Sequence, residues 1–136
     1  MQEEETKQTT LNVSKTDYGH IMLVDDDEDI LNLFANYLKT KGYRVRPFLN
    51  PFKALEQMQV EPQNYSLLIT DVRMPGISGI ELAKRVYGIN SKVKVILTSA
   101  FDLDGTDMKG ITYDEFVKKP IHMESLIESI DQVLNN

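Results

Sequence analysis

Residues 67–71 (LLITD) form a short apolar run that ends in a carboxylate. Three other segments have the same form, an apolar run that ends in polar residues: 21–26 (IMLVDD), 93–99 (VKVILTS) and 115–120 (EFVKKP). Such runs, with helical patterns between them, predict the parallel strands of βα units. Because the carboxyl ends of parallel strands open on one edge of a sheet, these polar residues are expected to meet there. They comprise three carboxylates, a hydroxyl and an ammonium: Asp25, Asp26, Asp71, Ser99 and Lys119.

Between the runs, apolar residues recur at the spacing of amphipathic helices. The first helix is expected to bury one face made of Ile30, Leu33, Phe34, Tyr37 and Leu38. Asp27 or Asp29 suits the first turn of this helix, and Gly42 suits its end. Residues 43–48 then predict a short strand at the edge of the sheet.

Three later helices have signals of their own. Asn50 and Pro51 are typical of a helix start, as a cap and a first-turn proline. Ser78 and Glu81 are spaced as a capping box for the next helix. The apolar faces expected in these helices are Phe52, Leu55 and Met58, then Leu82, Ala83 and Val86, and last Met123, Leu126, Ile127, Ile130 and Leu134.

Residues 100–111 are the weakest part of the pattern. Asp and Gly are frequent there and disfavour helix interiors, so the fourth helix is expected to be short or irregular. Five βα units within residues 19–136 predict one α/β domain with a doubly wound, five-stranded parallel sheet. Residues 1–18 are polar and are expected to form a flexible N-terminal tail.

The composition narrows the class of protein. With 41% hydrophobic and 26% charged residues, the chain is typical of globular proteins. A net charge of -6 and the lack of a Lys/Arg cluster argue against direct nucleic-acid binding. No apolar run approaches the roughly 18 residues of a membrane span, so membrane insertion is not expected. The absence of cysteine suits a reducing compartment, and a cytoplasmic location is expected.

Residues 20–136 resemble the receiver domain of two-component response regulators, in what looks like its stand-alone form. The likeness is carried by residues 24–26 (VDD), 70–76 (TDVRMPG), 99–100 (SA) and 119–120 (KP), in the order that the family has. The resemblance implies a flavodoxin-like (βα)5 fold with strand order 2-1-3-4-5. It also implies a phosphoacceptor signalling domain, and not an enzyme beyond its self-catalysed phosphorylation and dephosphorylation.

The resemblance assigns a metal and its ligands. Asp71 would accept the phosphoryl group, and Mg²⁺, for which Mn²⁺ can substitute, would bind beside it. Asp26, Asp71 and the backbone carbonyl of Arg73 would ligate the ion directly, and Asp25 would act mainly through water. Physical chemistry independently favours a hard divalent cation here, because clustered carboxylates repel one another and oxygen is the ligand that Mg²⁺ prefers.

The resemblance also assigns a cation beside the acids. Lys119 would pair with Asp71 or with its phosphoryl oxygens. Lys118 is expected to point to the opposite face, because side chains alternate along a strand. The Lys119-Pro120 peptide bond is cis in the family, which makes Pro120 a candidate cis-proline. Arg73 and Phe101 would lie near the site and influence how fast the phosphate is lost.

A hydroxyl and an aromatic residue would respond to the phosphoryl group. Ser99 is favoured over Thr98 as the hydroxyl that closes on this group, because Ser99-Ala100 matches the family pattern. Phe116 matches the aromatic that turns inward as the hydroxyl moves. The spacing from Ser99 to Lys119 is about two residues shorter than usual for the family, which places the usual dimerisation of receivers in doubt.

The expected partners are a sensor histidine kinase or a histidine phosphotransfer protein as donor, and an unidentified downstream protein. The main alternative is an interaction module that keeps the receiver fold as a scaffold and acts without phosphorylation. A more distant alternative comes from residues 101–106 (FDLDGT), which resemble the nucleophile motif of haloacid-dehalogenase-type phosphatases. The chain after residue 106 is too short for the further motifs that such phosphatases need.

Overall fold

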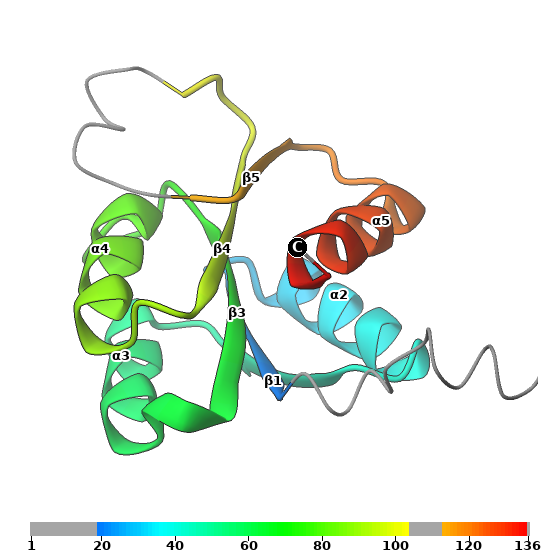
Figure 1. The fold of residues 1–136 in the computed structure, drawn as a ribbon. Helices are drawn as coiled ribbons and strands as arrows, with labels where there is room; N and C mark the ends of the chain where they lie inside the picture. The colour runs from blue at the N-terminus through cyan, green and yellow to red at the C-terminus, as the bar shows by residue number, and fades with distance from the viewer. Residues whose placement is uncertain (1–18, 104–112, 136) are drawn as a thin grey trace, which may run out of the picture.

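A computed structural model describes residues 19–103 and 113–135 of the chain. A five-stranded parallel sheet lies between two layers of helices, with α3 and α4 on one face and α2 and α5 on the other (Figure 1). In chain order the elements are β1 (His20–Val24), α2 (Glu28–Thr40), β2 (Arg44–Phe48), α3 (Pro51–Val60), the short 3-10 helix η2 (Pro62–Asn64), β3 (Tyr65–Asp71), α4 (Gly79–Ile89), β4 (Lys94–Ser99), β5 (Glu115–Lys118) and α5 (Met123–Leu134).

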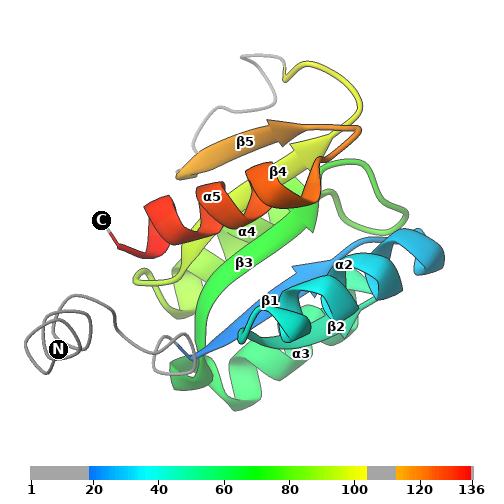
Figure 2. The ribbon, with the colours of Figure 1, turned by 90° about the vertical axis from the view of Figure 1, so that its right-hand side faces the viewer.

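The strand order is β2-β1-β3-β4-β5, and every neighbouring pair is parallel. The predicted doubly wound, flavodoxin-like α/β fold with order 2-1-3-4-5 is therefore confirmed. All strands point the same way, so their carboxyl ends form one edge of the sheet (Figure 2). The predicted fourth helix falls largely on residues 104–112 and the predicted tail on residues 1–18, and both stretches lie outside the described residues.

The helices that follow β2 and β3 begin at the predicted caps, and the helix after β1 begins at Asp27, which is its cap, with Asp29 in its first turn. The Asp27 side chain accepts hydrogen bonds from the amides of the first turn of α2. Asn50 caps α3 in the same way, and Ser78 accepts from the Glu81 amide at the start of α4. Gly42, just after α2, has φ of +97°, a backbone conformation that suits glycine and ends a helix. Local sequence thus determines where α2, α3 and α4 begin at this edge of the sheet.

Two apolar clusters bury both faces of the sheet. Side chains alternate along β1, so that Ile21 and Leu23 join one cluster while Met22 and Val24 join the other. The inner strands are apolar on both faces for this reason, as expected of a covered parallel sheet. This packing holds the strand ends rigidly in place. Within the described residues no helix has the length and the apolar character needed to span a bilayer.

Two of the predicted helix faces are partly wrong. Leu33 is 58% exposed and Phe52 is 48% exposed, although both were expected in the core. In α2 the residues that lie deepest are Leu31, Ala35 and Leu38. Leu31 and Ala35 were not part of the predicted face, so the buried face is rotated about the helix axis from the predicted one.

Candidate functional site

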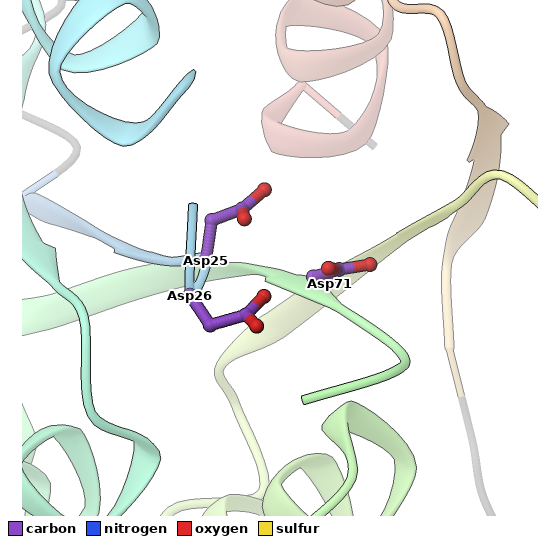
Figure 3. A group of neighbouring side chains, drawn as sticks. All are labelled: Asp25, Asp26 and Asp71. Atoms are coloured by element: carbon purple, nitrogen blue, oxygen red, sulfur yellow. The ribbon is translucent and has the colours of Figure 1, made fainter. Parts of the chain in front are cut away.

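Three carboxylates meet at the carboxyl edge of the sheet. Asp71 is the last residue of β3, and Asp25 and Asp26 directly follow β1. Val24 is the register partner of Thr70, so the residues after them lie side by side. Each carboxylate offers an oxygen that lies within 4.8 Å of the others. The side chains of this acidic cluster (Asp25, Asp26 and Asp71) lie beside one another at the ends of β1 and β3 (Figure 3).

The members of the acidic cluster differ in their surroundings. Asp25 and Asp71 are only 4% and 8% exposed, whereas Asp26 is exposed. Asp25 Oδ1 accepts a hydrogen bond from the Asp27 amide at 2.9 Å. Within the described part of the chain, the Asp26 carboxylate has no hydrogen-bond or ion-pair partner. Asp26 is therefore the acid whose oxygens are free to bind a ligand at the open side.

Lys119 supplies the cation of the site. Its Nζ atom donates a hydrogen bond to Asp25 Oδ2 at 3.0 Å and lies 3.4 Å from Asp71 Oδ2. The backbone amide of Lys119 donates to the Ser99 carbonyl at 2.8 Å, which extends the β4–β5 pairing up to the site. The neighbouring Lys118 pairs instead with the exposed Asp102 at 3.0 Å. The two lysines thus diverge, as the alternation of side chains along a strand predicts.

Burial and neighbouring charges shape the electrostatics of the site. Burial raises the pKa of Asp71, and the nearby charges of Asp25 and Asp26 raise it further, while Lys119 acts in the opposite direction. For Lys119, burial alone would lower the pKa, but the hydrogen bond to Asp25 and the charge of Asp71 outweigh it and raise the pKa. One ammonium therefore faces three carboxylates, and the site has an excess of negative charge.

The donor set fits a divalent cation. Oxygen ligands from two or three carboxylates are what hard cations such as Mg²⁺ and Ca²⁺ bind. A dication between these carboxylates would relieve the repulsion that helps to raise the pKa of Asp71. The acidic cluster can thus hold a metal ion without rearrangement of the strands.

The two hydroxyls at the end of β4 lie in different surroundings. Ser99 Oγ accepts a hydrogen bond from the Phe101 amide at 3.1 Å, so it is tied to the loop that follows the strand. Ser99 also lines a cavity of about 570 Å³ beside Val72 and Arg73. Thr98 Oγ1 instead donates to the Thr70 carbonyl at 3.4 Å, between two inner strands. The Ser99 hydroxyl is thus bonded to the loop after β4, and the Thr98 hydroxyl to the backbone of β3.

The remaining predicted residues flank the acidic cluster. The Arg73 guanidinium lies over the Phe101 ring, 4.6 Å from its centroid, so the loops after β3 and β4 touch above the sheet edge. Phe116, the register partner of Leu97, is partly buried against the cluster of apolar residues under α3 and α4. The Lys119-Pro120 peptide bond is cis, as predicted.

One residue that lies against the Asp71 backbone was not predicted from the sequence. Gly79 begins α4, and a Cβ atom at this position would collide with the backbone carbonyl oxygen of Asp71. A glycine eight positions after a strand-end acid was the only available signal, and it does not by itself reveal a contact. The structure shows the contact because α4 turns back over the end of β3.

Comparison with known proteins identifies the class to which this fold and site belong. Residues 21–131 match the response regulator receiver domain, and the chain belongs to that family. A relative is the response regulator receiver protein CpdR of Brucella abortus, 34% identical over 116 residues, a match that covers 84% of this chain and 95% of CpdR. The transcriptional regulatory protein YkoG of Bacillus subtilis is 32% identical, but only 51% of that protein is covered.

Solved structures agree with this assignment. The receiver domain of the hybrid histidine kinase CckA has a TM-score of 0.73 and 30% identity, with 85% of this chain and 99% of that chain covered. A CheY-like receiver domain from Methanospirillum hungatei has a TM-score of 0.78 at 22% identity, with 86% and 94% covered, and so supports the fold. The chain is thus a receiver domain, which is a signalling domain.

Proposed function

We propose that this receiver domain accepts a phosphoryl group on Asp71, with Mg²⁺ bound, and signals by a changed affinity for a downstream protein. The donor would be a phosphohistidine on a sensor histidine kinase or on a histidine phosphotransfer protein in the cytoplasm. The observation that carries the proposal is the position of Asp71. Its carboxylate offers an oxygen within 4.8 Å of those of Asp25 and Asp26, and it lies 3.4 Å from the Lys119 ammonium.

The transfer itself is a displacement at phosphorus. A carboxylate oxygen of Asp71 forms a bond to phosphorus while the P–N bond of the phosphohistidine breaks, and the electron pair of that bond returns to the imidazole nitrogen. Such a reaction depends mainly on alignment and on neutralisation of charge. Lys119 is placed to contact the phosphoryl oxygens, because its ammonium already lies between Asp25 and Asp71.

The proposed metal ligands are the carboxylates of Asp26 and Asp71 and the backbone carbonyl of Arg73, with Asp25 acting through water. Mg²⁺, or Mn²⁺ in its place, would neutralise the oxygens of the transferring group. The exposure of Asp26 supports a direct role, since its carboxylate can reach an ion without losing a protein partner. Asp25 is already bound to Lys119 and to the Asp27 amide, which supports an indirect role.

The proposed response begins at Ser99. Its hydroxyl would leave the Phe101 amide and turn toward the phosphoryl group, so that the following loop moves with it. Phe116 would then turn further inward, and because it has no hydroxyl, its effect on a partner is one of packing alone. Thr98 is the alternative hydroxyl, but its bond to the Thr70 carbonyl keeps it within the sheet.

The two alternatives differ in their support. A scaffold that acts without phosphorylation would need the same fold. It does not explain why two acids, Asp25 and Asp71, are buried beside Lys119. The phosphatase alternative places the nucleophile at Asp102, which is exposed and paired with Lys118. That pairing and the membership of the receiver family argue against it.

Phosphorylation by acetyl phosphate tests the proposal. Wild type, Asp71→Asn and Asp102→Asn are incubated with acetyl phosphate and Mg²⁺ and separated on a phosphate-affinity gel. We expect a shifted band for wild type and for Asp102→Asn, and none for Asp71→Asn or in the presence of a chelator. A wild type that does not shift would favour the scaffold. A shift that survives in Asp71→Asn and disappears in Asp102→Asn would restore the phosphatase alternative.

A further inference from the structure

Gly79 lies against the backbone of Asp71. It is the first residue of α4, next to the cap Ser78. A Cβ atom added to Gly79 would collide with the carbonyl oxygen of Asp71 and would lie 2.9 Å from its carbonyl carbon. The same atom would lie 3.1 Å from Cγ2 of Thr70. Helix α4 therefore begins in direct contact with the peptide that carries the proposed phosphoacceptor.

Hydrogen bonds hold the backbone around Asp71 in place. Thr70 Oγ1 donates a hydrogen bond to the Asp71 carbonyl at 2.9 Å. The Val72 amide donates to the Thr98 carbonyl at 2.9 Å, and the Val72 carbonyl accepts from the Gly79 amide at 2.8 Å. Each of these bonds ties the segment to a buried strand or to the start of α4. A group added at residue 79 must therefore move either α4 or the acceptor peptide.

Glycine is required here for space and not for an unusual backbone conformation. The described glycines with positive φ are Gly19, Gly42 and Gly76, and Gly79 is not among them. Alanine would otherwise be a better helix residue than glycine at a helical position. At Gly88, near the end of the same helix, an added Cβ atom would meet nothing within 4 Å, so this constraint is lacking there. The two glycines of α4 thus differ in their contact with Asp71.

We infer that Gly79 is a positioning residue for the chemistry at Asp71, a statement that rests on the proposed phosphoacceptor role. By letting α4 begin against the Asp71 peptide, Gly79 sets where the Asp71 carboxylate stands relative to Lys119 and the other two acids. The distance that defines this arrangement is the 3.4 Å between Asp71 Oδ2 and Lys119 Nζ. A shift of this carboxylate misplaces a metal ligand and a nucleophile together.

The matched variants Gly79→Ala and Gly88→Ala test this inference. Mg²⁺ affinity is measured by isothermal titration calorimetry without a phosphodonor, and the rate of phosphorylation by acetyl phosphate is measured at saturating Mg²⁺. We expect Gly79→Ala to weaken Mg²⁺ binding by about tenfold and to slow phosphorylation by at least as much. Gly88→Ala should stay within about twofold of wild type in both, because it adds a methyl group in open space.

Stability is measured alongside, by urea unfolding, because a structural role alone would lower stability without changing the site. A folded Gly79→Ala protein with wild-type Mg²⁺ affinity and phosphorylation rate would overturn the inference. The proposed function would still stand in that case, since wild type is phosphorylated and Asp71→Asn is not. Conversely, a wild type that binds Mg²⁺ but is never phosphorylated would refute the proposed function. The Mg²⁺ affinity of Gly79→Ala relative to wild type would then test whether Gly79 positions the Asp71 carboxylate as a metal ligand.

Thr70→Val provides the second variant if Gly79→Ala does not fold. It keeps the shape of the side chain and removes the hydroxyl that donates to the Asp71 carbonyl. If the backbone of Asp71 is positioned by its neighbours, Thr70→Val should weaken Mg²⁺ binding by a few-fold. Unchanged Mg²⁺ affinity in Thr70→Val, with Gly79→Ala unfolded, would count against the inference.

Discussion

Lys119 Nζ lies closer to Asp25 than to Asp71, at 3.0 Å from Asp25 Oδ2 and 3.4 Å from Asp71 Oδ2. The two residues Asp25 and Lys119 come from opposite ends of the domain, 94 positions apart, and both are largely buried. Asp25 therefore anchors the ammonium at the edge of the acidic cluster, while the Asp71 carboxylate keeps a looser contact. In the proposed transfer, an Asp71 oxygen would therefore react without first breaking the shorter ion pair.

The first prediction concerns the loss of this cation. Lys119→Met keeps most of the apolar stem but leaves Asp25 and Asp71 buried without their partner. We expect the free energy of unfolding at neutral pH to fall by about 2 kcal/mol, because removal of one member of a buried pair leaves an uncompensated charge. Urea unfolding in a chelator measures this change. Phosphorylation by acetyl phosphate should also slow strongly, because a cation no longer faces the transferring group.

Lys119→Arg is the control that separates the effect of the positive charge from the effect of the shape of the ammonium group. It keeps the positive charge, so most of the stability should be retained. The planar guanidinium cannot reproduce the position of a compact ammonium, so slow phosphorylation should persist. A Lys119→Met protein as stable as wild type would show that the acids do not depend on this ion pair.

The second prediction follows from the raised pKa of Asp71. An acid whose pKa is raised by folding binds its proton more tightly in the folded state, so it contributes stability below its unfolded pKa and loses that contribution as pH rises through the folded pKa. At neutral pH the ionised Asp71 therefore weakens the fold. Asp71→Asn should raise the free energy of unfolding by about 1 kcal/mol at pH 7.5 in a chelator. The advantage should shrink as the pH falls toward the range in which Asp71 is protonated.

Mg²⁺ provides the check on this second prediction. A ligand that binds only the folded state stabilises it, so saturating Mg²⁺ should stabilise wild type more than Asp71→Asn and narrow the gap between them. Urea unfolding at pH 7.5, with and without Mg²⁺, measures both effects. If Asp71→Asn is less stable than wild type in the presence of the chelator, the prediction is wrong, and the excess of negative charge at the site does not lower the free energy of unfolding.

The third prediction separates the two hydroxyls at the end of β4. Beryllofluoride with Mg²⁺ mimics the acyl phosphate, and the amide of Phe101 reports on the Ser99 hydroxyl because it donates to Ser99 Oγ. In wild type and in Thr98→Val, we expect the mimic to shift the NMR signal of this amide. In Ser99→Ala the signal should already be displaced and should respond little to the mimic. The opposite result, with the response lost in Thr98→Val, would assign the switch to Thr98.

The sequence was sufficient to predict the strand-end residues of the site, and the reason is geometric. An apolar run that ends in a polar residue marks both the strand and its carboxyl end, so Asp25, Asp71 and Lys119 could be placed on one edge before the structure was known. The contact of Gly79 with Asp71 could not be predicted in this way. It depends on how α4 returns over β3, which is a matter of tertiary packing and leaves no periodic signal.

The predicted face of α2 was displaced for a related reason. The predicted face omitted both Leu31 and Ala35, which are buried in the structure. The apolar residues of α2 occupy two neighbouring faces that share Leu38, so their spacing fits either face. Which of the two faces packs against the sheet depends on tertiary contacts.

The fourth prediction tests this corrected face with two leucines of the same helix. Leu31 is 3% exposed and Leu33 is 58% exposed, although only Leu33 belonged to the face expected from the sequence. Leu31→Ala should lower the free energy of unfolding by about 3 kcal/mol, because it leaves a cavity in the core beneath α2. Leu33→Ala should change it by less than about 1 kcal/mol, because a largely exposed side chain loses little burial and alanine favours the helix. Urea unfolding of the two variants gives the comparison, and equal losses would restore the face predicted from the sequence. Since α2 directly follows Asp25 and Asp26, Leu31→Ala should also weaken Mg²⁺ binding more than Leu33→Ala does.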